Sequence, residues 1–149
     1  MTVELKIHRL AGTEDIPLPC YMSEGASGMD LYSANDEPIT LAPGDIRLVP
    51  TGIRIELPAG YEAQIRPRSG LAAKHGVTVV NAPGTIDSDY RGEVKVILGN
   101  VSRKPFEITR GTRIAQMVIA QPVRARIIEA DSLNDTARGA GGFGHTGAK

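Results

Sequence analysis

A chain of 149 residues is long enough for one compact domain with an ordinary hydrophobic core and short for two. Its 17 basic and 17 acidic residues cancel, so no global field attracts a nucleic acid polymer, and a bound anion must meet local positive charge or a metal ion. Cys20 is the only cysteine, which excludes an intramolecular disulfide. Because we also find no signal-peptide pattern and no membrane-spanning apolar run, we expect a cytoplasmic protein without a membrane partner.

Apolar and polar residues alternate in short runs along most of the chain, which is typical of strands with one buried face. The clearest runs lie at residues 53–57, 61–65, 94–98 and 123–127. Turns rich in proline and glycine separate the runs, which favours many short strands in a sandwich or barrel. One short stretch has a helical pattern, with Ser69 as its expected N-cap and Gly76 as its expected end. We predict a single domain over 1–149, in which 131–149 form a C-terminal arm.

Two segments place charged side chains beside an expected turn or helix start. In RPRSGLA, residues 66–72, two arginines precede Ser69, and arginine side chains and helix N-termini both favour phosphate. A solvated arginine and a serine cap would explain the same residues. In SGMDL, residues 27–31, Asp30 either caps a turn or helps to position Mg²⁺ through water, as hard oxygen ligands do.

The segment NAPGTIDSDYRGE, residues 81–93, predicts a strand end, a Pro-Gly turn and then a tight hairpin around residues 88–89. Asp87 is either a turn former or a general base for a water molecule. Tyr90 could form a flat wall against a ring or a sugar, and Asn81 could contact the edge of a base.

In RGTRIAQM, residues 110–117, alternation places Arg113, Ala115 and Met117 on one face of a strand. Gln116 then lies on the other face, among apolar residues. It is either a satisfied core amide or a donor aimed at a ligand.

The chain ends in RGAGGFGHTGAK, which contains the pattern G-x-G-x-x-G at Gly139, Gly141 and Gly144. We do not expect a dinucleotide-binding turn here, because the stretch before these glycines is polar and turn-like and no residues follow that could form the required helix. A flexible terminus is one interpretation, and a lid whose backbone N–H groups wrap a polyanion is the other. Phe143, one of only two phenylalanines, favours a stacking role because core packing explains it poorly in such a segment.

Taken in order, the five segments resemble the five motifs of the homotrimeric dUTP pyrophosphatase (dUTPase) family, from Ser27 to Thr146. The tail resembles the fifth motif, R-G-x-G-G-F-G-S-T-G, with His145 in place of the usual serine, and Thr112 stands where an acidic residue is common. The resemblance implies an all-β fold, a distorted jelly-roll β-barrel. It also implies a threefold homotrimer with active sites between subunits.

The resemblance further implies hydrolysis of dUTP to dUMP and pyrophosphate with Mg²⁺, which limits uracil in DNA and supplies dUMP for dTTP synthesis. Asp87 would activate the attacking water, and Asp30 would order the water shell of the metal. Tyr90 would pack on deoxyribose, and Phe143 would stack over uracil. The remaining expected substrate contacts are Asn81 and Gly84 at uracil, Arg68, Ser69, Gly70 and Gln116 at the phosphates, and Thr85, Ile86, Lys95, Arg138, Gly144, His145 and Thr146.

Three other functions remain open. The first is dCTP deamination on the same fold, which differs by one exocyclic group of the base and needs a product assay to distinguish. The second is a nucleotide sensor without turnover, against which Asp87 argues because a pure binder gains nothing from a carboxylate near a polyanion. The third is a structural jelly-roll module, which would leave the glycine-rich tail unexplained.

Overall fold

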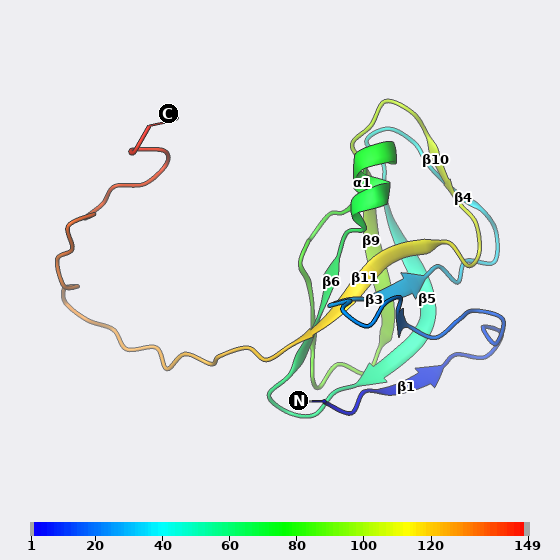
Figure 1. The fold of residues 1–149 in the computed structure, drawn as a ribbon, viewed down its shortest axis with the longest axis horizontal. Helices are drawn as coiled ribbons and strands as arrows, with labels where there is room; N and C mark the ends of the chain where they lie inside the picture. The colour runs from blue at the N-terminus through cyan, green and yellow to red at the C-terminus, as the bar shows by residue number, and fades with distance from the viewer. Residues whose placement is uncertain (1, 148–149) are drawn as a thin grey trace.

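The structure is a computed structural model that describes residues 2–147, and its body is built of short antiparallel strands joined by loops (Figure 1). The strands are β1 (Lys6–Arg9), β2 (Cys20–Tyr21), β3 (Met29–Tyr32), β4 (Ile39–Leu41), β5 (Ile46–Glu56), β6 (Glu62–Arg66), β7 (Val77–Val79), β8 (Gly84–Asp87), β9 (Glu93–Asn100), β10 (Phe106–Ile108) and β11 (Arg113–Ala120). A short helix, α1 (Ser69–His75), lies at one end of the sheets (Figure 1). No helix among the described residues is long and apolar enough to cross a bilayer.

The strands form three sheets that enclose one hydrophobic core. The sheet orders are β1-β5-β9-β7, β10-β4 and β2-β3-β11-β6-β8. Inward side chains from all three sheets meet in one buried cluster, to which Leu31, Leu41, Val49, Leu98 and Met117 contribute fully buried groups. The predicted all-β, jelly-roll-like architecture is therefore confirmed, but the sheets do not close into a barrel.

The alternating runs at 53–57, 61–65 and 94–98 lie in β5, β6 and β9, as predicted. The fourth run, 123–127, is not a strand, and Val123 and Ile127 are almost fully exposed. Within residues 2–147 no strand pairs with this run. All residues from 121 to 140 are exposed, and Figure 1 shows this segment leading away from the body.

The helix begins at Ser69, which was predicted to be the N-cap and not the first helical residue. Arg68 occupies the N-cap position without a side-chain cap bond, and Ser69 is the first helical residue, so the prediction of a serine cap is wrong. Gly76 ends the helix as predicted. Its φ of 63° is left-handed, and its N–H bonds to the carbonyl groups of Leu71 and Ala72, which is a conformation that glycine adopts readily.

The predicted turn at residues 87–90 is present, because the Tyr90 N–H donates to the Asp87 carbonyl at 3.1 Å. The predicted hairpin is wrong, since β8 pairs with β6 and β9 pairs with β5 and β7. The turn therefore carries the chain from one sheet to the other. Turn chemistry fixes a local reversal of direction, whereas the pairing of the flanking strands depends on distant residues.

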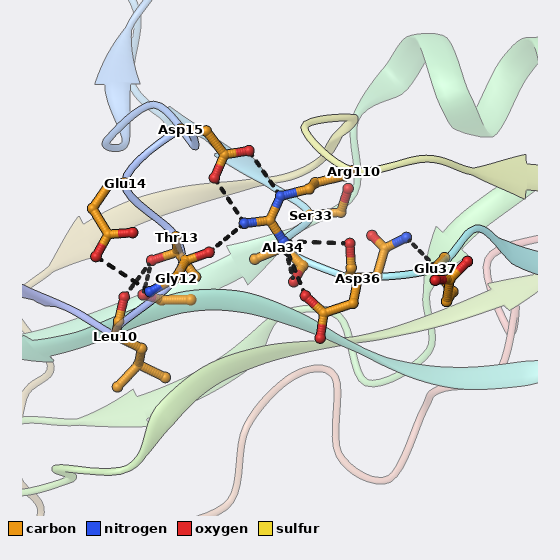
Figure 2. Close-up of polar contacts among 12 residues, drawn as sticks. Leu10, Gly12, Thr13, Glu14, Asp15, Ser33, Ala34, Asp36, Glu37 and Arg110 are labelled. Atoms are coloured by element: carbon orange, nitrogen blue, oxygen red, sulfur yellow. Dashed lines mark hydrogen bonds and ion pairs between the residues drawn. The ribbon is translucent and has the colours of Figure 1, made fainter.

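Arg110, in the turn before β11, is hydrogen-bonded to two other loops, one after β1 and one after β3 (Figure 2). Its guanidinium donates to both carboxylate oxygens of Asp15, at 2.8 and 2.7 Å, and to the carbonyl groups of Gly12 and Ala34. The bidentate bond lowers the pKa of Asp15 and raises that of Arg110. Next to it, Ser33 accepts from the Thr112 N–H, so the turn before β11 is held from both sides.

Candidate active site

A cluster of two arginines and one amide surrounds a buried carboxylate at the centre of the five-stranded sheet. The side chain of Asp30, on β3, is 2% exposed. Arg113 lies 3.1 Å from one of its oxygens, while Arg68 and Gln116 lie 3.5 and 3.3 Å from the other. A buried carboxylate is stable only when it is paired in this way. We call Asp30, Arg68, Arg113 and Gln116 the Asp30 cluster.

Strand register explains why these residues meet. Gln116 on β11 lies opposite Asp30 on β3 and opposite Arg66 on β6. The pairing slips between Arg113 and Ala115, and the bulge buries Ile114 as well as Ala115. The predicted strict alternation is therefore wrong at this point, and the bulge directs Arg113 toward Asp30 instead of into the core.

Arg113 belongs to this cluster although no sequence motif predicted it as a site residue. A signal for it was available, because alternation placed its charge on the face of Ala115 and Met117, where an unpaired charge is costly. Such a conflict indicates either a bulge or a buried counter-charge, and the structure contains both. Arg113 makes no other side-chain hydrogen bond within residues 2–147, so its remaining N–H groups are available to an anion.

Ser69 and Gly70 are exposed at the start of α1, directly after Arg68. Arg68 also donates to the carbonyl of Arg113 at 3.2 Å, which ties the loop before the helix to the start of β11. Ser69 and Gly70 thus follow directly on a member of the Asp30 cluster. At the other side, a Cβ atom on Gly28, directly before β3, would lie only 3.2 Å from the Gln116 Cβ, so a larger residue there would press on the Gln116 side chain.

A second group of predicted residues lines a hollow of about 250 Å³ beside the turn at 87–90. Five of the residues around it were predicted site residues: the proposed base Asp87 and the proposed substrate contacts Thr85, Ile86, Tyr90 and Lys95. Leu48, Glu93, Val94 and Ile97 complete its lining. The Ile86 side chain is 8% exposed and belongs to the core, so only its backbone can face a ligand. We call this site the turn hollow.

Asn81 and Gly84 lie together just before the turn hollow. A Cβ atom on Gly84 would lie 3.1 Å from the Asn81 Nδ2 atom. Because Gly84 lacks this atom, the amide of Asn81 can rest against the backbone of β8. Asp87 follows at the end of β8, opposite Glu62 on β6, and also borders a hollow of about 590 Å³ on its other side.

The tail residues lie apart from both groups. Arg138 donates from Nε to the Gly141 carbonyl at 2.7 Å, and Phe143 is fully exposed with a φ of 51°. Gly144, His145 and Thr146 are exposed as well. The structure of this one chain therefore does not bring the predicted tail residues to the other predicted residues (Figure 1).

The Asp30 cluster and the turn hollow are separated within one chain by the length of β6. Gln116 pairs with Arg66 at one end of this strand, and Asp87 pairs with Glu62 at the other. Four residue steps along a strand correspond to about 13 Å. One chain thus presents a cationic group and a carboxylate-bearing hollow that do not share a common centre.

Jelly-roll-like sheets that carry a cationic cluster around a buried carboxylate, and a separate hollow lined by a carboxylate and a tyrosine, define an all-β protein equipped for a phosphorylated ligand. Residues 14–147 match the family described as dUTPase. The chain therefore belongs to the dUTPase family.

Curated relatives agree over nearly the whole chain. The deoxyuridine 5'-triphosphate nucleotidohydrolase of Thermoanaerobacter sp. (strain X514) is 59% identical over 147 residues, which cover 99% of each chain. The enzyme of the same name from Rhizobium etli (strain CFN 42) is 59% identical over 145 residues, covering 96% of this chain and 93% of the relative.

Two solved structures share the fold. A mutant dUTPase of Staphylococcus bacteriophage 80alpha with dUpNHpp has a TM-score of 0.85 and 21% identity, covering 98% of this chain and 99% of its own. A dUTPase mutant from phage phi11 of S. aureus, described with a structural Mg(II) ion, has a TM-score of 0.77 and 19% identity, covering 89% of this chain and 99% of its own.

Proposed function

We propose that this protein hydrolyses dUTP to dUMP and pyrophosphate. The observation that carries the proposal is the match to dUTP nucleotidohydrolases at 59% identity over 99% of both chains. Two groups of residues support it further. Arg68 and Gln116 lie around the buried carboxylate of Asp30, and Asp87 and Tyr90 line the turn hollow.

In this proposal, the Asp30 cluster receives the phosphates. Arg68 and Arg113 supply N–H donors that match phosphate oxygens, and Asp30 holds both guanidiniums in fixed directions. Gln116 contributes an amide, and Ser69 and Gly70 contribute exposed groups beside it.

Asp87 acts as the general base in the turn hollow. Its carboxylate is exposed and next to Tyr90 and Lys95, which are also exposed. It accepts a proton from the water that attacks the α-phosphorus, and the bond from that phosphorus to the bridging oxygen breaks to release pyrophosphate. Tyr90 packs on the deoxyribose, and Asn81 and the backbone at Gly84, Thr85 and Ile86 contact uracil.

The residues fit a Mg²⁺ ion that is held mainly by phosphate oxygens and water. Among residues 2–147, no three His, Cys, Asp or Glu side chains are close enough together to hold a metal ion. Both oxygens of Asp30 face arginine or amide donors, so Asp30 would act on the ion through water. When bound, Mg²⁺ neutralises charge on the phosphates.

We propose a homotrimer with sites between subunits, because one chain separates the Asp30 cluster from the turn hollow by the length of β6. An apolar face on the four-stranded sheet supports this assembly. Ile46 and Leu48 on β5 and Val80, directly after β7, are 59%, 58% and 48% exposed on the two sides of β9, which is unusual for large apolar side chains. A second copy would cover them.

We also propose that the arm serves a neighbouring subunit. Val123, Ile127 and Leu133 are each about nine-tenths exposed or more, so the alternating pattern of the arm has no partner in its own chain. Placed on a neighbour, the arm would bring Arg138, Phe143 and the predicted residues 144–146 over the bound nucleotide and exclude water.

The proposed activity is tested by incubating the protein with Mg²⁺ and each deoxynucleoside triphosphate in turn. We expect pyrophosphate from dUTP alone, together with dUMP. Deamination of dCTP would instead support the related deaminase activity, and binding of dUTP without any product would support a sensor.

A further inference from the structure

The ring of Tyr90 lies against Gly92 in a space that any larger residue would fill. A Cβ atom built on Gly92 would lie 2.3 Å from the Tyr90 Oη, 2.5 Å from Cζ and 2.9 Å from Cε2. Carbon atoms pack favourably at about 3.5–4.0 Å, so a methyl group at this position would force the ring away by roughly 1 Å. Gly92 does not have a left-handed φ, so only this contact excludes a side chain there.

One hydrogen bond holds the end of the Tyr90 ring, and two others hold the backbone of the turn. The Tyr90 hydroxyl donates to the carbonyl of Glu93 at 3.0 Å, which folds the side chain back over Gly92. Arg91 donates from Nη1 to the carbonyl groups of Ser88 and Tyr90, at 2.7 and 3.0 Å, and so braces the turn itself. The backbone at Tyr90 is thus held, while the ring is 46% exposed and can swing if its place is taken.

We propose that Gly92 is a specificity-determining residue that acts through Tyr90. By lacking a Cβ atom, it admits the tyrosine ring to the rim of the turn hollow, where the ring excludes a sugar that carries a 2′-hydroxyl. This inference rests on the proposed function, in which Tyr90 packs on deoxyribose. Gly92 is a positioning residue, since it touches Tyr90 and not the substrate.

The contact between Gly92 and the Tyr90 ring also explains why Gly92→Ala should change the substrate preference and not the stability of the fold. The group that a methyl would strike is the free end of an exposed side chain, so the ring can move without disturbing the core. Gly92→Ala should therefore fold normally and show an unfolding temperature close to that of the original protein.

The test compares kcat/KM for dUTP and UTP, both with Mg²⁺. We expect Gly92→Ala to lower kcat/KM for dUTP and to reduce the dUTP/UTP preference by about tenfold or more, the size of effect produced by one misplaced methylene-sized contact. Gly25→Ala is the matched control, because Gly25 is exposed, has nothing within 4 Å of a built Cβ and lacks a left-handed φ. It should keep the original preference.

A double-mutant cycle shows whether Gly92 acts through the ring. If it does, adding Gly92→Ala to Tyr90→Ala leaves the preference of Tyr90→Ala unchanged. An equal loss in both backgrounds would overturn the inference, and so would an unchanged preference in Gly92→Ala alone. If the original protein released no pyrophosphate from dUTP, the proposed function would fall, and this inference with it.

Discussion

The position of the arm can be tested by mixing two inactive chains. The first lacks residues 138–149, and the second carries Asp87→Asn. The first retains an intact turn hollow but no lid, and the second retains the lid but no base. The chain from 121 to 138 can extend over roughly 55 Å, against a radius of gyration of about 14 Å for a domain of this size, so an arm can reach a neighbouring subunit.

The expected recovery of activity depends on which chain supplies Asp87 and which chain supplies the arm. If a site takes its base from one chain and its arm from another, equal mixing makes each part intact in half of the chains, and about a quarter of the sites are complete. If each arm covers the turn hollow of its own chain, every site lacks one part and activity stays near zero. The two chains are unfolded, mixed, refolded and assayed for pyrophosphate, and mixed trimers are confirmed by mass.

A complementary mixture serves as the control. Here the original chain is mixed equally with a chain that carries both changes. About a quarter of the sites are complete if the arm acts in trans, and about half are complete if it acts in cis. Zero recovery in the first mixture, with half-activity in the second, would refute the proposed arm exchange.

Asp87→Asn should lower kcat by roughly 10²–10⁴-fold while dUTP still binds, since the amide keeps the shape but not the basicity, and near-normal turnover would show that another group is the base. Ile46→Glu should yield monomers in analytical ultracentrifugation and abolish activity, because it puts a charge on the apolar face; an intact trimer would place the interface elsewhere. Asp15→Asn should lower the unfolding temperature near pH 7. Because Arg110 lowers the pKa of Asp15, this stabilisation is fully present above the ordinary pKa of about 3.9 and is lost as pH falls through the lower folded value. The difference between the two proteins should therefore vanish in acid, and a difference that grows would contradict the role of the ion pair.

Local sequence pattern predicted the strands well where one face of the strand meets its own core. The run at 53–57 is an example, with Ile53 and Ile55 both buried in β5. The run at 123–127 has the same pattern but forms no strand. Alternation shows that one face of a segment needs a partner, but it does not say which chain supplies that partner.

The remaining errors concern long-range pairing. Turn residues at 87–90 predicted the reversal, yet they could not show that β8 and β9 belong to different sheets. The bulge at Arg113 depends on Asp30, which is 83 residues away in the sequence. The Asp30 cluster could be predicted only as separate motifs, because sheet register, and not spacing along the chain, brings its members together.

The order of strands in the five-stranded sheet has a consequence for biosynthesis. The last strand among residues 2–147, β11, lies between β3 and β6 and is hydrogen-bonded to both. A nascent chain that stops short of Ala120 therefore carries two half-sheets with unpaired edges and no common neighbour. Such edges can pair with other chains during synthesis. This sheet cannot be completed before Ala120 has been translated, so a ribosome stalled before β11 would release an aggregation-prone fragment and not a smaller folded unit.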